Sequence, residues 1–140
     1  MRILGIDLGD KTIGLAVSDP SGLVSQPVKT VRRTEAERDI EAVKNVIDEY
    51  DIGKIVIGLP KNMNGSIGPQ SEKTLAFAET LRGATGLEVI SWDERLTTVA
   101  AERALLEADL SRRKRREVID SVAASIILQG YLESQSPSEY

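Results

Sequence analysis

Short apolar runs separated by turn residues fill the first third of the chain. The first run, Arg2 to Asp7, carries apolar residues on both faces, as a strand buried inside a sheet does. Asp19-Pro20-Ser21-Gly22 has the residues of a β-turn, and Pro27 favours an edge position for the strand that contains it. The pattern predicts strands at residues 2–7, 13–18 and 23–31 that form a meander.

Beyond these strands, apolar residues recur at helical spacing and short strands alternate with helices. Thr34-Glu35-Ala36-Glu37 reads as a capping box, which predicts the start of a helix that continues to about Tyr50. Thr97 or Thr98 is expected to cap a later helix. The predicted elements that follow the first helix are a strand at 54–58, a helix at 70–82, a strand at 87–92, a helix to about 108 and a last helix after the basic run 112–116.

This order of elements predicts an α/β fold with a mixed five-stranded sheet flanked by helices. A right-handed crossover places the fourth strand beside the first, so the expected strand order is 3-2-1-4-5. Ligands of such sheets bind beyond the carboxyl ends of the strands, at the point where the order reverses. We expect one domain over residues 1–133, followed by a disordered tail at 134–140.

The composition limits the kinds of catalysis that the chain could perform. The 140 residues are 41% hydrophobic and 29% charged, as in a globular protein, and no apolar run approaches the ~20 residues of a membrane span. The chain has no histidine and no cysteine, which excludes Ser-His-Asp and Cys-His catalysis, disulfides and the usual zinc sites. A cytoplasmic location without membrane association is the expectation, and catalysis would depend on carboxylates, hydroxyls, lysine or a hard metal ion.

The first strand ends in a carboxylate, Asp7, inside the segment ILGIDLGDKTIG. The glycines and Lys11 suggest a phosphate-binding loop, but a P-loop would need glycine where Asp10 stands and a helix after it. The glycines instead suit a tight turn between antiparallel strands. Because a carboxylate in a buried strand is costly unless it is paired or binds a metal, Asp7 is a candidate functional residue.

Two more acidic positions are expected at the same edge of the sheet. Asp93 and Glu94 end the fifth strand and point in opposite directions, so only one of them should share a site with Asp7. Asp120 lies on a face of the last helix that is otherwise apolar and small. Asp19 is a weaker candidate because its turn explains it. Such a carboxylate cluster suits Mg²⁺ or Mn²⁺, and a two-metal site of this kind hydrolyses phosphodiester bonds.

Basic residues are expected to surround this acidic centre. The predicted nucleic-acid contacts begin with the run just before the helix of Asp120, namely Arg112, Arg113, Lys114, Arg115 and Arg116. Lys61 and Arg95 extend this set, as Arg32 and Arg33 do. Aromatic residues make up only 4% of the chain, so base stacking on an aromatic surface is not indicated.

Four motifs resemble one known family. GIDLGDKTIGLAVSD, VIGLPKNMNGSIG, SWDERLTTVAAERAL and VIDSVAASIILQGYL occur in the order found in the YqgF family, also described as RuvX-type, and together span nearly the whole chain. The resemblance implies a ribonuclease H-like fold and activity as a nuclease for pre-16S rRNA or a Holliday junction resolvase.

By position, the resemblance makes Asp7, Glu94 and Asp120 the catalytic and metal-binding residues, with Asp7 shared by two ions. It also implies that Asn64 and the backbone of its glycine-rich loop contact phosphate. One departure is Thr12, where related proteins often carry a basic residue. The basic neighbour Lys11 points to the other face of an extended chain, and it is kept as a candidate nucleic-acid contact.

The resulting hypothesis is a divalent-metal-dependent nuclease that matures the 5′ end of pre-16S rRNA during ribosome biogenesis. Its partners would be structured RNA and a ribosomal subunit precursor, and the protein would be a monomer or a weak dimer. A resolvase acting on branched DNA is the first alternative and should require a symmetric dimer. A non-catalytic RNA-binding assembly factor would tolerate loss of the carboxylates. A sugar-kinase-like ATPase would need a second domain to enclose the nucleotide, which these 140 residues are not expected to provide.

Overall fold

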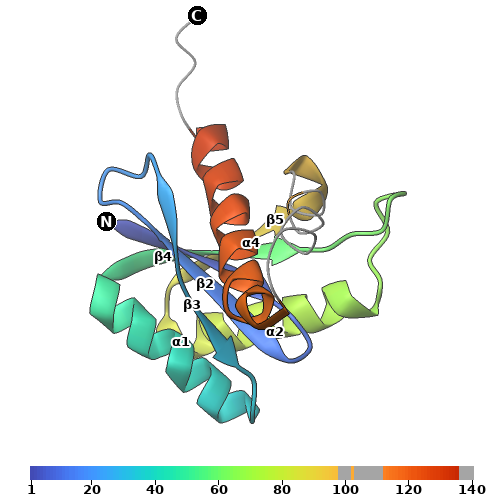
Figure 1. The fold of residues 1–140 in the computed structure, drawn as a ribbon, viewed down its shortest axis with the longest axis horizontal. Helices are drawn as coiled ribbons and strands as arrows, with labels where there is room; N and C mark the ends of the chain where they lie inside the picture. The colour runs from blue at the N-terminus through green and yellow to red at the C-terminus, as the bar shows by residue number, and fades with distance from the viewer. Residues whose placement is uncertain (98–101, 103–111, 136–140) are drawn as a thin grey trace, which may run out of the picture.

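The computed structural model describes residues 1–97, 102 and 112–135. Their strands are β1 (Arg2–Leu8), β2 (Thr12–Ser18), β3 (Ser25–Arg32), β4 (Ile52–Leu59) and β5 (Glu88–Asp93). The helices are α1 (Ala36–Tyr50), α2 (Pro69–Thr85), the short 3-10 helix η1 (Glu94–Leu96) and α4 (Arg112–Gln135), as Figure 1 shows. Among the described helices, none is long and apolar enough to cross a membrane.

The strands form one sheet in the order β3-β2-β1-β4-β5, which confirms the predicted order. β1 is antiparallel to β2, and β2 is antiparallel to β3. β1 is parallel to β4, and β4 is parallel to β5. The carboxyl ends of β1, β4 and β5 therefore meet at one edge of the sheet, which is the edge where ligands of α/β sheets bind.

Helices cover both faces of this sheet. Leu4, Ile6 and Leu8 of β1 pack in one hydrophobic cluster with side chains of α1 and α2. The other cluster is built by α4 on the opposite face. Side chains alternate along a strand, so Gly5 and Asp7 face α4. A methyl group at Gly5 would lie 2.7 Å from Leu128 Cβ, which confirms that this face of β1 meets α4.

Three details differ from the sequence predictions or lie beyond them. The capping-box prediction is wrong: Glu35 is the N-cap of α1 and makes no side-chain cap bond, while Asp39 accepts from the backbone nitrogen of Thr34 at 3.0 Å. The basic run 112–116 does not precede the last helix but begins it, because charged residues with long side chains are good helix formers. The helix predicted from Thr97 or Thr98 to about 108 falls almost entirely outside the described residues, as do residues 136–140 of the tail.

Candidate active site

Asp7 lies near the carboxyl end of β1 and is only 5% exposed. Gly14 of β2 is its register partner on one side. On the other side Ile6 pairs with Ile57 of β4, so the next residue of β4, Gly58, stands beside Asp7. Two glycines thus flank this buried carboxylate on the face that meets α4.

Gly14 brings α4 into close contact with the sheet. A methyl group at Gly14 would overlap the backbone carbonyl of Asp120, so only glycine allows the helix to lie here. The hydroxyl of Thr12, two residues earlier on the same face of β2, donates a hydrogen bond to Oδ2 of Asp120. Asp120 is therefore held beside the strand that pairs with Asp7, well inside α4 and not in its first turn.

Gly58 likewise leaves room beside the sheet, in this case for the side chain of Glu94. A methyl group at Gly58 would lie 3.2 Å from both Cγ and Oε2 of Glu94, and 2.5 Å from Cδ1 of Ile127. The Glu94 side chain thus lies over the strand next to β1, in the space left by the missing side chain. Thr97 fixes the backbone of Glu94, since its nitrogen and its hydroxyl both donate to the Glu94 carbonyl, at 3.3 and 3.1 Å.

Asp93 is held by an ion pair with Arg95 and, unlike Glu94, does not lie over the strand beside β1. Its carboxylate accepts from Arg95 Nη2 at 2.7 Å and from Arg95 Nε at 3.1 Å, and it accepts from the Arg95 backbone nitrogen at 3.0 Å. The hydrogen bond from the Arg95 side chain is the main reason that the pKa of Asp93 is lowered, and the pair in turn raises the pKa of Arg95. Of the two adjacent acids, Glu94 is the one directed toward the strand beside Asp7.

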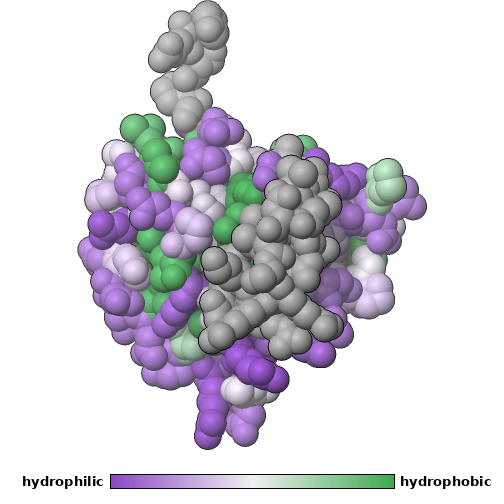
Figure 2. Space-filling model, viewed as in Figure 1, coloured by the Kyte–Doolittle hydropathy of each residue, from purple (hydrophilic) through white to green (hydrophobic). Residues whose placement is uncertain are grey.

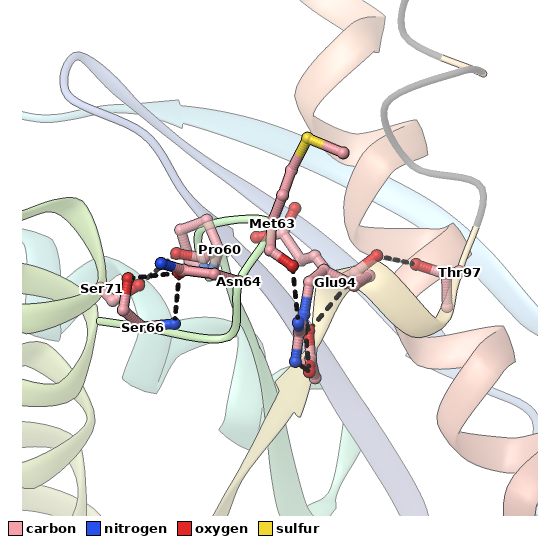
Figure 3. Close-up of polar contacts among 9 residues, drawn as sticks. Pro60, Met63, Asn64, Ser66, Ser71, Glu94 and Thr97 are labelled. Carbon is pink, nitrogen blue, oxygen red and sulfur yellow. Dashed lines mark hydrogen bonds and ion pairs between the residues drawn. The ribbon is translucent and has the colours of Figure 1, made fainter. Parts of the chain in front are cut away.

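The glycine-rich loop between β4 and α2 stands beside η1 (Figure 3). Arg95 Nη1 donates to the Met63 carbonyl at 3.3 Å and so connects the loop to η1. Asn64 Oδ1 accepts from the backbone nitrogen and the hydroxyl of Ser66, at 3.0 and 2.6 Å. The Asn64 oxygen therefore shapes the loop, and only its amide NH₂ remains as a donor for a phosphate. Met63, at 98% exposure, extends from the loop toward solvent.

The donor chemistry of Asp7, Glu94 and Asp120 suits a hard divalent cation, because all three offer carboxylate oxygens. The glycines beside Asp7 leave room for these side chains on one face of the sheet. Among the residues that the structure describes, no three acidic side chains form a single metal-binding group.

Lys61 and Lys11, two of the predicted nucleic-acid contacts, lie on opposite sides of Asp7. Lys61 lies near Asp93 and helps to lower the pKa of Asp93, so Lys61 is on the same side of Asp7 as Glu94. Lys11 is exposed and lines a hollow of about 760 Å³ together with Asp120, on the other side of Asp7. The backbone of residues 112–116 is the start of α4, but their side chains lie outside the described part of the chain.

Sequence reasoning missed the role of Thr12. In the sequence Thr12 stands out only as a departure from related proteins, whereas the structure makes it the hydrogen-bond donor to Asp120. A signal was available, because Thr12 and Gly14 are two residues apart and must share a face of β2 with Asp7 opposite. Only the position of α4 reveals that this face meets Asp120.

Comparison with known proteins shows the family to which the chain belongs. A family model described as "RuvX: Holliday junction resolvase" matches residues 1–134. The chain belongs to the RuvX family. A relative from Clostridioides difficile, named "Putative pre-16S rRNA nuclease", is 61% identical over 132 residues, which are 94% of each chain. A relative of the same name from Clostridium botulinum is 57% identical and covers 97% of this chain and 99% of its own.

Solved structures of resolvases share this fold. RuvC of Thermus thermophilus, solved in complex with a Holliday junction substrate, superposes with a TM-score of 0.62 at 14% identity and covers 96% of this chain and 95% of its own. The Holliday junction resolvase of fowlpox virus gives a TM-score of 0.57 at 17% identity, with 97% and 100% covered. At such identities the likeness concerns the fold alone, and it confirms the ribonuclease H-like fold expected for the RuvX family.

Proposed function

We propose that this protein is a divalent-metal-dependent nuclease whose catalytic residues are Asp7, Glu94 and Asp120. One observation carries the proposal: buried Asp7 stands between two glycines, and these admit Asp120 from α4 on one side and Glu94 from η1 on the other. A glycine at both positions lets helix and carboxylate approach the sheet more closely than any side chain would. This arrangement brings acids from three distant segments to one edge of the sheet.

The chain's own residues would hold the ions and orient the substrate. Asp7, Glu94 and Asp120 are the residues that would hold two Mg²⁺ or Mn²⁺ ions. When bound, such ions activate a water molecule and stabilise the oxygen that leaves the phosphorus. Thr12 keeps the Asp120 carboxylate in one orientation through its hydroxyl, and Thr97 keeps the Glu94 backbone in place. Lys61 and Lys11, on opposite sides of Asp7, would contact phosphates of the nucleic acid that flank the cleaved bond.

Structured RNA is the proposed substrate, and the 5′ end of pre-16S rRNA within a cytoplasmic ribosomal subunit precursor is its proposed setting. The names of the relatives that are 57% and 61% identical support this choice. The second candidate is cleavage of branched DNA, which the description of the family model favours. A resolvase that cuts two strands in step would act as a symmetric dimer, whereas the RNA nuclease would act as a monomer or weak dimer.

A paired cleavage assay tests the proposal. Precursor 16S rRNA and a four-way DNA junction are incubated with the protein in Mg²⁺, in Mn²⁺ and in EDTA. We expect cleavage of the RNA in the presence of metal and none in EDTA, for a protein whose mass in solution is that of a monomer. Faster cleavage of the junction by a dimer would support the resolvase instead. RNA binding without cleavage of either substrate would contradict the nuclease and favour a non-catalytic assembly factor.

A further inference from the structure

Two hollows adjoin where the β1–β2 turn meets the end of β3. One, of about 760 Å³, lies on the α4 side and includes Thr12 and Asp120 among its lining residues. The other, of about 600 Å³, lies toward α1 and α2 and includes Thr34 and Lys73. Lys11 and Arg32 line both, so the two hollows adjoin at these side chains, at the end of the sheet. This edge lies at the bottom of the views in Figures 1 and 2, where hydrophilic residues gather.

The charge of these hollows is predominantly positive. Lys11 and Arg32 are exposed, and no ion pair of either is found within the described part of the chain. Lys73 contacts Asp10 at 3.9 Å, but both side chains are more than half exposed, so this pair adds little stability and is readily exchanged for another anion. The lining thus offers cations that are available to a ligand.

Arg33 lines the hollow beside α1 and α2 with a guanidinium that is fixed in place and whose charge is balanced by Asp39. Its Nη1 donates to the Gly9 carbonyl at 2.8 Å, and its Nε pairs with the buried carboxylate of Asp39 at 3.3 Å. Its guanidinium carbon lies 6.0 Å from the centre of the Phe77 ring. An arginine held by three neighbours loses little freedom when an anion binds, which favours binding.

We propose that these hollows form one track for the phosphodiester backbone of the nucleic acid, leading from Asp120 past Lys11 and Arg32 to Lys73. The proposal rests on the proposed function and extends it, because it assigns binding of phosphates away from the cleaved bond to Arg32, Arg33 and Lys73. The track crosses the end of the sheet from its α4 face to its α1–α2 face. A nucleic acid on it would be contacted on both sides of the β1–β2 turn.

Binding measured in EDTA tests the track separately from catalysis. The probe is a fluorescent RNA hairpin with a single-stranded arm, titrated at several salt concentrations with the double variant Arg32→Gln/Lys73→Gln. The matched control is Arg2→Gln/Lys44→Gln, which removes the same charge elsewhere. We expect the first variant to bind at least tenfold more weakly at low salt. The slope of log K against log salt concentration should fall in magnitude by about 0.7–0.9 per lost contact. The control variant should match wild type in both respects. Equal binding by the two double variants would overturn the track.

Two further readouts distinguish the alternatives. Both substituted positions are exposed, so the melting temperature of the double variant should equal that of wild type, and loss of binding cannot then be ascribed to unfolding. Hairpins with and without a 5′ phosphate should lose affinity equally, and a loss confined to the phosphorylated hairpin would replace the track by a pocket for a terminal phosphate. If wild type cleaves no substrate but binding behaves as expected, the proposed nuclease function fails and the track stands.

Discussion

Gly14 and Gly58, which have no side chains, let Asp120 and Glu94 approach the strands on either side of Asp7. At Gly14 a methyl group would meet the backbone of Asp120, which cannot move without displacing α4. At Gly58 it would meet the side chains of Ile127 and Glu94, which can move a little. The two positions therefore differ in what a substitution should do to the fold and to the site.

Gly58→Ala should separate stability from activity. The methyl group would overpack Ile127 and push Glu94 away from the strand beside Asp7, so we expect a loss of roughly 1–3 kcal/mol in unfolding free energy and a larger proportional loss of cleavage. Gly83→Ala is the control: it lies in α2 with open space around it, and alanine there should stabilise by about 0.4–1 kcal/mol. Urea unfolding and cleavage rates measure the effects of both substitutions. A fully active Gly58→Ala variant would argue against a catalytic role for Glu94.

Thr12 acts on the reaction through Asp120. Valine has nearly the same shape but no hydroxyl, so Thr12→Val should leave Asp120 without this donor and lower the cleavage rate about tenfold or more. Thr12→Ser keeps the hydroxyl and should restore most of the rate. Rates at saturating RNA, with melting temperatures alongside, measure this. If serine were as defective as valine, the methyl group rather than the hydrogen bond would be the important part of Thr12.

At the scale of elements, the sheet could be predicted and the ends of the helices could not. Strand order follows from the alternation of strands and helices along the chain and from the handedness of crossovers. The first is a local sequence pattern, and the second is a general rule of protein folds. The start of α1 depends instead on Asp39, whose buried carboxylate accepts from Thr34 and Arg33, and no short-range motif marks that contact. The approach of α4 to Gly14 is a tertiary contact between residues far apart in sequence, and so the role of Thr12 was hidden.

The turn between β2 and β3 gives a prediction on pH. Asp19 accepts hydrogen bonds from the Ser21 hydroxyl and from the backbone of Val24 and Leu23, at 2.9 and 2.8 Å for the last two, and these lower its pKa from 3.8 to about 2. Its ionised form therefore stabilises the fold above pH 3.8, and this contribution disappears as the pH falls toward 2.

Asp19→Asn should accordingly lower the melting temperature at pH 7, and the gap to wild type should narrow below about pH 4, the range set by the ordinary and the lowered pKa. Asp48→Asn, on the exposed side of α1, is the comparison and should show little difference at any pH. Thermal unfolding from pH 7 to pH 3 measures both. A gap for Asp19→Asn that stays constant with pH would mean that charge on Asp19 does not stabilise this turn.

At the scale of the whole molecule, the proposed site depends on the packing of α4 against the sheet. α4 crosses the strands so that Asp120 meets β2, Leu128 meets β1 and Ile127 meets β4, and each of these crossings occurs at a glycine. Asp7 lies under this crossing, while the hollows lined by Lys11 and Arg32 open beside it. The fold thus places buried Asp7 near an exposed basic surface, which suits the proposed cleavage of a polyanion.

The most direct test of the account is the response of Asp7→Asn to Mn²⁺. Wild type should gain thermal stability as Mn²⁺ is added, because an ion that binds only the folded state stabilises it, and it should cleave RNA in the same range of concentration. Asp7→Asn should fold, show little or no gain in melting temperature with Mn²⁺ and lose cleavage by about a hundredfold or more. A variant that still cleaves RNA and is stabilised by Mn²⁺ as wild type is would contradict a metal centre built on Asp7.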